Sequence, residues 1–171
     1  SIGSFEVTPL EMVEAYSTIA NGGKRITPYP IRRIETQNGT VIERHNFAAT
    51  QVVPASTAWV VQSMLRGVYE NTYNAHISGL QAAGKTGSTN DWRDAWYDGF
   101  TPNLCTVIHV GADAARAQTS AIRNAGSRFP AMTWKAYMQQ AMKLYKQDAF
   151  TAKPEGVSVR VVCSDSGLPA S

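Results

Sequence analysis

The sequence predicts an α/β fold of the α+β type, in which helices pack on an antiparallel sheet. Residues 95–100 and 104–111 are apolar runs with the composition of strands, and Thr101-Pro102-Asn103 separates them. Apolar residues recur with helical spacing in residues 54–69 and 131–146. The chain has 171 residues, of which 43% are hydrophobic and 17% charged, which suits one globular domain or a large piece of one.

The composition also argues against several classes of protein. The net charge of +3 comes without a basic run, so we expect no nucleic-acid partner. No apolar run has the length of a membrane span or the form of a signal peptide. Cys105 and Cys163 are too few for a disulfide framework, and the sequence does not decide whether they pair.

The first expected element is a helix that begins after Thr8. Thr8-Pro9-Leu10-Glu11 has the form of a capping box with proline at the first helical position, and Asn21-Gly22-Gly23 ends the helix. We expect its apolar side to be buried. This side comprises Leu10, Met12, Val13, Tyr16, Ile19 and Ala20.

The next segment is expected to be extended chain. Residues 24–36 contain Pro28 and Pro30, which favour an edge or irregular strand. Asn38-Gly39 then predicts a type I′ turn that leads into a returning strand at residues 41–43.

A second helix is predicted at residues 54–69, followed by an irregular loop at residues 70–80. We interpret His76 in this loop as a solvated side chain, because no metal-ligand spacing surrounds it. The apolar side chains expected to face inward from the helix are Val60, Val61, Met64, Leu65 and Val68.

Residues 104–110 have the β-branched content of a central strand, with His109 packed within it. In the helix predicted at residues 131–146, Lys143 and Lys146 lie in the last turn, where they would favour the helix dipole. Residues 153–156 read as a linker, 157–162 as a further short strand, and the rest as a tail. The expected inner face of the helix comprises Trp134, Tyr137, Met138, Ala141 and Tyr145.

The segment with the most chemistry is residues 83–91, and two interpretations compete for it. Residues 79–86 match G-x-x-x-x-G-K-[ST], the loop that binds nucleotide phosphates. That loop needs a strand before it and a helix after it. Polar residues 70–76 precede the match and turn-forming residues 87–91 follow it, so the sequence does not favour nucleotide binding.

The second interpretation is acyl transfer, since Lys85-Thr86-Gly87 is the third element of the S-x-x-K, S-x-N and K-T-G set. On an edge strand, alternation sends Lys85 and Gly87 to one face and Thr86 and Ser88 to the other. Gly87 lacks a Cβ, so another backbone or a substrate can approach closely.

Residues 84–102, G-K-T-G-S-T-N-D-W-R-D-A-W-Y-D-G-F-T-P, closely resemble the segment around K-T-G in class A penicillin-binding proteins. The resemblance extends to residues 3–12 with 20–23 and to residues 162–168, so it covers nearly the whole chain. It implies a partial transpeptidase fold of the penicillin-binding and serine β-lactamase type. Residues 1–150 would be the C-terminal half of the transpeptidase domain, and residues 151–171 a linker and tail.

The resemblance also implies that Lys85, Thr86, Gly87 and Ser88 bind the substrate. Lys85 would supply positive charge beside the nucleophile, and the Ser88 backbone N–H would be one donor of the oxyanion hole. The Thr86 and Ser88 hydroxyls, on either side of Gly87, would bind the carboxylate of the D-Ala-D-Ala stem peptide or of a β-lactam. No metal or other cofactor is expected. Trp92, Arg93 and Asp94 are interpreted as structural.

The nucleophile is the missing part, because no serine in the chain has a lysine three residues later. We therefore expect the other half of the domain, an N-terminal membrane anchor and a glycosyltransferase domain to lie outside these residues, and an apolar surface to be exposed here. The parent protein would act at the extracytoplasmic face of the bacterial membrane. A non-catalytic module with this fold remains the alternative.

Overall fold

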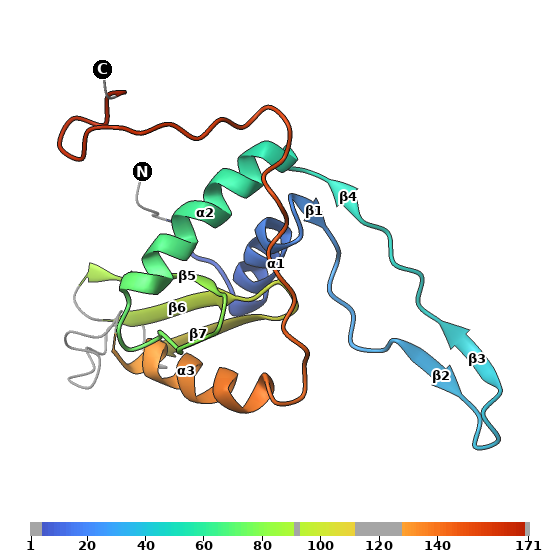
Figure 1. The fold of residues 1–171 in the computed structure, drawn as a ribbon. Coiled ribbons are helices and arrows are strands. Elements are labelled where there is room, and N and C mark those ends of the chain that lie inside the picture. Colours follow the sequence, from blue (N-terminus) through green and yellow to red (C-terminus); the bar gives the residue numbers. More distant parts are fainter. Residues whose placement is uncertain (1–4, 91–92, 112–127, 170–171) are drawn as a thin grey trace.

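The structure, a computed structural model, describes residues 5–90, 93–111 and 128–169 (Figure 1). Three antiparallel strands form its central sheet in the order β5 (Ala83–Ser88), β6 (Asp94–Phe100) and β7 (Cys105–Gly111). The pair of strands predicted at residues 95–111 is confirmed. However, the middle position belongs to β6 and not to β7, which is an edge strand in the described part of the chain.

Helices cover both faces of this sheet. Tyr97 and Phe100 lie three positions apart on β6, so their side chains point to opposite faces. Tyr97 packs against Trp134 of α3 (Phe129–Ala141), with ring centroids 5.3 Å apart. Phe100 packs against Tyr16 of α1 (Pro9–Ala20), with centroids 6.3 Å apart. Thus α1 lies on one face, and α3 lies on the other.

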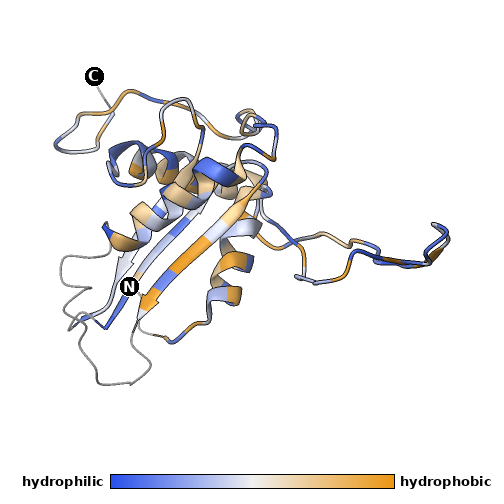
Figure 2. Cartoon of the chain, turned by 90° about the horizontal axis from the view of Figure 1, so that it is seen from below, coloured by the Kyte–Doolittle hydropathy of each residue, from blue (hydrophilic) through white to orange (hydrophobic). Residues whose placement is uncertain are grey.

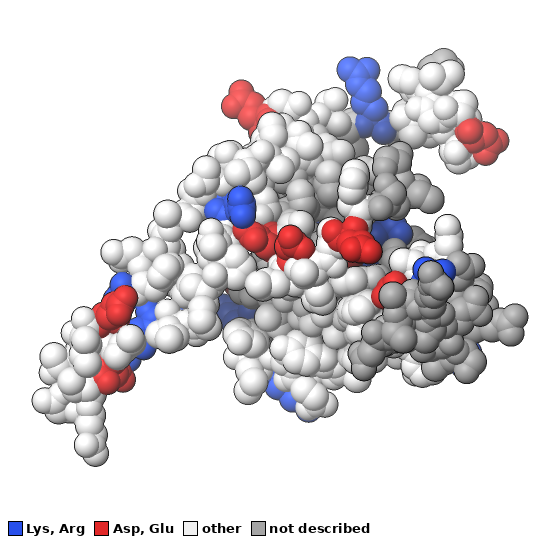
Figure 3. Space-filling view, turned by 180° about the vertical axis from the view of Figure 1, so that it is seen from behind, with Lys and Arg blue, Asp and Glu red and all other residues white. Residues whose placement is uncertain are grey.

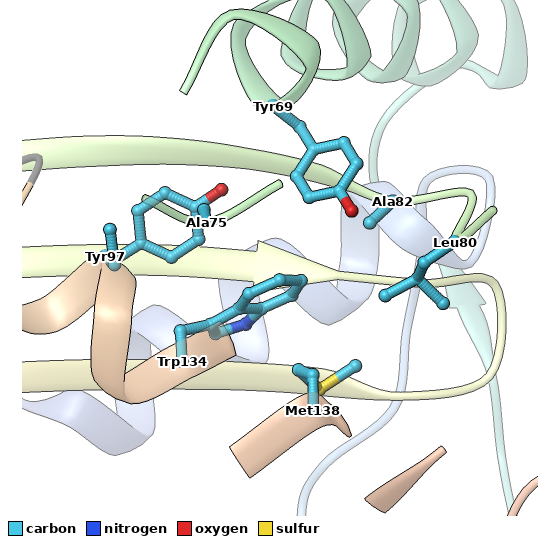
Figure 4. Close-up of a cluster of buried hydrophobic side chains, with 8 residues drawn as sticks. Tyr69, Ala75, Leu80, Ala82, Tyr97, Trp134 and Met138 are labelled. Carbon is cyan, nitrogen blue, oxygen red and sulfur yellow. The ribbon is translucent and has the colours of Figure 1, made fainter. Parts of the chain in front are cut away.

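The main core lies on the α3 face, where α2 (Ala55–Asn71) also packs (Figure 4). The Tyr69 ring of α2 contacts Trp134 edge-on at 5.9 Å, and the Tyr69 hydroxyl accepts from the Ile77 N–H at 2.8 Å. Each large apolar side chain buried here contributes about 1.5–3 kcal/mol by leaving water. The buried members are Tyr69, Ala75, Leu80, Ala82, Tyr97, Ala131, Trp134 and Met138.

The capping box of α1 is confirmed. The Thr8 N–H donates to Glu11 Oε2 at 2.7 Å, and the Glu11 N–H donates to Thr8 Oγ1 at 3.2 Å. The predicted buried side is wrong at Leu10, which is 61% exposed. Thr18 is buried instead, because its hydroxyl donates to the Glu14 carbonyl at 2.8 Å and needs no water.

The inward face of α2 is also rotated from the prediction. Val60 and Met64 are exposed, whereas Gln62 is buried. Gln62 Nε2 donates to the Ile19 carbonyl at 2.6 Å, at the end of α1, where helical carbonyls lack intrahelical partners. The helix therefore turns a polar side chain inward, and the apolar pattern alone did not show this. The other buried residues of α2 are Ala58 and Tyr69.

The last helix, α3, ends at Ala141, five residues before the predicted end. The Lys143 N–H bonds to the Gln140 carbonyl and the Leu144 N–H to the Ala141 carbonyl, so the chain tightens into turns there. The prediction that Lys143 and Lys146 occupy the last helical turn is therefore wrong. On the predicted inner face, Trp134, Met138 and Ala141 are buried, but Tyr137 and Tyr145 are exposed.

A long arm extends from the body between α1 and α2 (Figure 1). At its base β1 (Lys24–Arg25) pairs with β4 (Thr50–Gln51), and further out β2 (Arg33–Glu35) pairs with β3 (Val41–Arg44). The type I′ turn is wrong, because the Gly39 N–H donates to the Thr36 carbonyl at 3.0 Å. Gly39 then follows the turn with φ 86°, as in a three-residue loop closed by glycine.

The segment from residue 151 to 169 crosses the body near α2 without forming a helix or strand. Trp59 Nε1 donates to the Thr151 carbonyl at 3.2 Å. The strand predicted at residues 157–162 is wrong, since only an isolated bridge between Val162 and Pro169 forms. The domain boundary at residue 150 stays a prediction. Among the described residues, no helix is both long and apolar enough to cross a membrane.

Candidate functional site

Strand β5 carries the Lys85-Thr86-Gly87 sequence along one edge of the sheet, as its end position in the strand order shows. Lys85 and Ser88 are exposed, and Thr86 and Gly87 are half-buried between them. Lys85 Nζ donates to the Thr86 carbonyl at 2.8 Å. Because Thr86 continues the strand and opens no helix, the nucleotide-loop interpretation of residues 79–86 is wrong.

The cross-strand register assigns each of these residues to a face. Lys85 lies opposite Asp98, and Thr86 lies opposite Tyr97. Directly opposed residues of an antiparallel pair share a face, with Cβ atoms about 4.5–5.5 Å apart. Since Tyr97 belongs to the α3 face, Lys85 lies on the α1 face with Asp98, and Thr86 lies on the α3 face.

Two glycines allow the side chains of β6 to lie close to β5. A Cβ at Gly84 would lie 2.5 Å from the Tyr97 hydroxyl, and one at Gly87 would lie 3.2 Å from Trp96 Cβ. The close neighbour of Gly87 is thus the Trp96 side chain of the same sheet and not another backbone, and the approach of a substrate stays a prediction. Gly84 leaves less space for a side chain than Gly87 does, and the sequence did not indicate this.

Hydrogen bonds join Thr89, which follows Ser88, to Asp94. Thr89 Oγ1 accepts from the Asp94 N–H at 2.8 Å, and the Thr89 N–H donates to the Asp94 carbonyl at 3.0 Å. Asp94 Oδ1 lies 2.8 Å from His109 Nε2, and the His109 ring lies against Trp96 with centroids 4.1 Å apart. His109 therefore lies within a strand, as predicted, but it is exposed on an edge strand of the described sheet and packs on one side only, against Trp96, and its contact with Asp94 joins β6 to β7. Trp92 lies outside the described residues.

Asp98 is the residue at this site that sequence reasoning missed. It is only 3% exposed, and its Oδ1 has no hydrogen-bond partner among the described residues. Burial raises the pKa of its carboxyl group to about 7, although the positive charge of Lys85 and a charge on His109 act in the opposite direction. The available signal was a carboxylate within the largely apolar residues 95–100, because such segments seldom bury an unpaired charge.

Loop residue His76 is not simply solvated, contrary to the prediction. Its Nε2 lies 3.2 Å from Glu70 Oε2, and its ring lies against Tyr69 with centroids 5.4 Å apart. These contacts tie the loop before β5 to the end of α2. Across the residues that the structure describes, no three His, Cys, Asp or Glu side chains gather in a group that could hold a metal ion.

Charge and hydropathy differ between surfaces of the molecule. On the side opposite the view of Figure 1, basic side chains are dispersed among acidic ones and do not gather into one patch (Figure 3). Seen from below, β7 is the most hydrophobic strand of the sheet (Figure 2). The apolar side chains of β7 are half-buried, whereas Phe5 and Leu10, before and at the start of α1, are exposed. That exposed side chains form one apolar surface stays a prediction.

Comparisons with known proteins agree with one another. The family described as "Penicillin binding protein transpeptidase domain" matches residues 1–140. Penicillin-binding protein 1A of Aquifex aeolicus (strain VF5) is 34% identical over 163 residues, which make up 94% of this chain and 22% of that protein. The chain thus spans about a fifth of the length of this curated relative.

Solved structures give the same result. The penicillin-binding protein PonA1 from Mycobacterium tuberculosis matches with a TM-score of 0.78 and 26% identity, over 90% of this chain and 43% of that one. The structure of PonA1 in complex with penicillin V matches with a TM-score of 0.77, 26% identity and the same coverage. The α+β fold with an antiparallel sheet is therefore the fold of this group of proteins.

Proposed function

Because the chain belongs to the penicillin-binding protein transpeptidase domain family, we propose that it forms part of a D,D-transpeptidase that cross-links peptidoglycan stem peptides by serine acyl transfer. β-Lactams would acylate the same serine. The observation that carries this proposal is an exposed Lys85 on an edge strand, followed by half-buried Thr86 and exposed Ser88. An edge strand leaves one side free for an extended peptide substrate to lie along it.

Each residue from Lys85 to Ser88 would have a distinct role. The Lys85 ammonium group would favour the transfer of a proton from the nucleophile and attract the substrate anion. The Thr86 and Ser88 hydroxyls would donate to the carboxylate of D-Ala-D-Ala or of a β-lactam. The Ser88 N–H would be one oxyanion donor, and Gly87 would keep the strand surface open beside it.

The attacking serine would come from polypeptide outside these 171 residues, because no serine here has a lysine three positions later. The same outside segment would supply the second oxyanion donor and the S-x-N serine. The parent protein would be a bifunctional synthase of the cell wall, with a glycosyltransferase domain and a membrane anchor, and would work at the extracytoplasmic face of the bacterial membrane.

The test uses the natural protein that carries this chain, a fluorescent penicillin and the Lys85→Ala variant. We expect covalent labelling of the wild type and an acylation rate about 10²–10⁴-fold lower in the variant, which is the usual range for losing a group that assists proton transfer. Lys143→Ala is the matched control, since its Nζ contacts only Gln140 Oε1 among the polar groups described.

Two results would count against the proposal. Equal acylation rates for the wild type and Lys85→Ala would remove Lys85 from the chemistry. A wild type that takes no label but binds penicillin reversibly would instead identify a non-catalytic module with this fold.

A further inference from the structure

Asp98 and Lys85 form an unusual pair on the α1 face of the sheet. They oppose each other directly across β5 and β6, and one is buried while the other is exposed. Asp98 Oδ1 is buried without a hydrogen-bond partner among the described residues. A buried acceptor without a donor destabilises the fold, so a nearby donor would be attracted to it.

The groups around Asp98 leave Lys85 as its strongest donor. From β7, His109 is already directed to Asp94, at 2.8 Å. From α1, Tyr16 faces this region, and burial raises the pKa of its hydroxyl to about 12, with the charge of Asp98 contributing. Burial likewise raises the pKa of the Cys105 thiol on β7 to about 11, so both groups are neutral at pH 7. Lys85 is the cation directly across the strand.

We infer that Asp98 is a positioning residue for Lys85, whose carboxylate holds the Lys85 ammonium group over the α1 face during acyl transfer. The ammonium group has three donors on a flexible stem, and the contact with the Thr86 carbonyl uses one of them. The two side chains, both in the described part of the chain, form no ion pair in the structure, so the ammonium group would have to turn toward Asp98 across the strand pair. The inference rests on the proposed function, because it concerns the same site.

The arrangement has a consequence for pH. Only the ionised carboxyl group attracts the ammonium group strongly, and the pKa of Asp98 is about 7. Below this pH the carboxyl group is protonated and its hold on Lys85 is lost. Other groups of the site titrate in both the wild type and Asp98→Asn. The ratio of the wild-type acylation rate to the variant's acylation rate therefore isolates the contribution of Asp98.

The experiment measures the acylation rate constant of the natural protein with a fluorescent penicillin from pH 5.5 to pH 8.5. We expect the ratio of wild type to Asp98→Asn to rise from about one at the acidic end to about tenfold at the basic end, with its midpoint near pH 7. A tenfold ratio of rates corresponds to a free-energy difference of about 1.4 kcal/mol, the difference that one pKa unit represents. Asp148→Asn is the matched control, because it removes an exposed carboxylate that bonds Asn103 instead.

A melting temperature for each variant separates positioning from stability. The pKa of Asp98 is raised above its ordinary value of 3.8, so ionising it costs folding stability as pH rises. Asparagine does not ionise, so Asp98→Asn should have a melting temperature no lower than that of the wild type at pH 8.5. A constant rate ratio across the pH range would overturn the inference.

The outcomes also separate this inference from the proposed function. If the wild type is labelled in a way that depends on Lys85 but the Asp98→Asn ratio stays flat, only the positioning role fails. If the wild type takes no label, the proposed function and this inference fail together.

Discussion

Among the glycines of the central sheet, Gly84 leaves the least space for an added Cβ. An added Cβ would lie 2.5 Å from the Tyr97 hydroxyl and 2.8 Å from Tyr97 Cζ. Tyr97 is fully buried against Trp134, so its ring has little space into which to move. We expect Gly84→Ala to lower the free energy of unfolding by about 1–3 kcal/mol, as overpacking of a core does. Urea denaturation of the natural protein measures this change.

Gly67 provides the matched control for this substitution. It lies within α2, and no heavy atom lies within 4 Å of the position of an added Cβ. Gly67→Ala should raise the free energy of unfolding by about 0.5–1 kcal/mol, because alanine favours a helix. Equal effects of the two substitutions would mean that Tyr97 does not restrict Gly84.

At the candidate site, only some of the residues could be predicted from the sequence. Lys85 to Ser88 could be proposed as site residues because the short motif and its flanks carry the signal in consecutive letters, and their roles stay a prediction. Asp98 could be noticed only as a carboxylate within a largely apolar segment. Its position opposite Lys85 and the pair of Asp94 with His109 could not be predicted, because they depend on which strands are neighbours. A pairing across strands is a long-range fact, and no local pattern along the chain contains it.

At the scale of elements, the capping box of α1 gives a prediction that depends on pH. Hydrogen bonds from the Thr8 N–H and hydroxyl lower the pKa of Glu11 below its ordinary value of 4.5. A lowered pKa means that the carboxylate stabilises the fold above pH 4.5 and that this contribution is lost as pH falls below it. We expect Glu11→Gln to weaken the loss of stability between pH 5 and pH 3, measured by thermal melting.

Thr8→Ala removes the other half of the same box. It should lower the free energy of unfolding at pH 7 by about 1 kcal/mol, the usual effect of losing an N-cap side chain. Thr40→Ala is a suitable control, since Thr40 lies on the arm and the hydrogen bonds described for it go through its backbone. An unchanged unfolding energy for Thr8→Ala would show that the box does not stabilise the helix.

The elements themselves were predictable where the signal is local. The start of α1, the pair β6 and β7, and the existence of α2 and α3 follow from caps and periodicity. Two features did not follow. Gln62 turned inward because it bonds the carbonyl groups at the end of α1, and the hairpin turn shifted by one residue because Thr36 accepts from Gly39. Both depend on backbone groups that the side-chain pattern does not report.

At the scale of the whole molecule, β5 is an edge strand, with its polar residues beside the free edge, and helices cover both faces of the sheet behind it. The class of this fold was predictable from composition and periodicity, and the order of its strands was not. The shape agrees with the proposal that a further part of the protein completes the site along β5, since acyl transfer needs a nucleophile and an oxyanion hole together.

The most direct measurement compares the isolated 171-residue chain with the natural protein, each treated with the same fluorescent penicillin and analysed under denaturing conditions. The account predicts covalent label on the natural protein, on a serine outside these residues, and none on the isolated chain. Label on any serine of the isolated chain would contradict it.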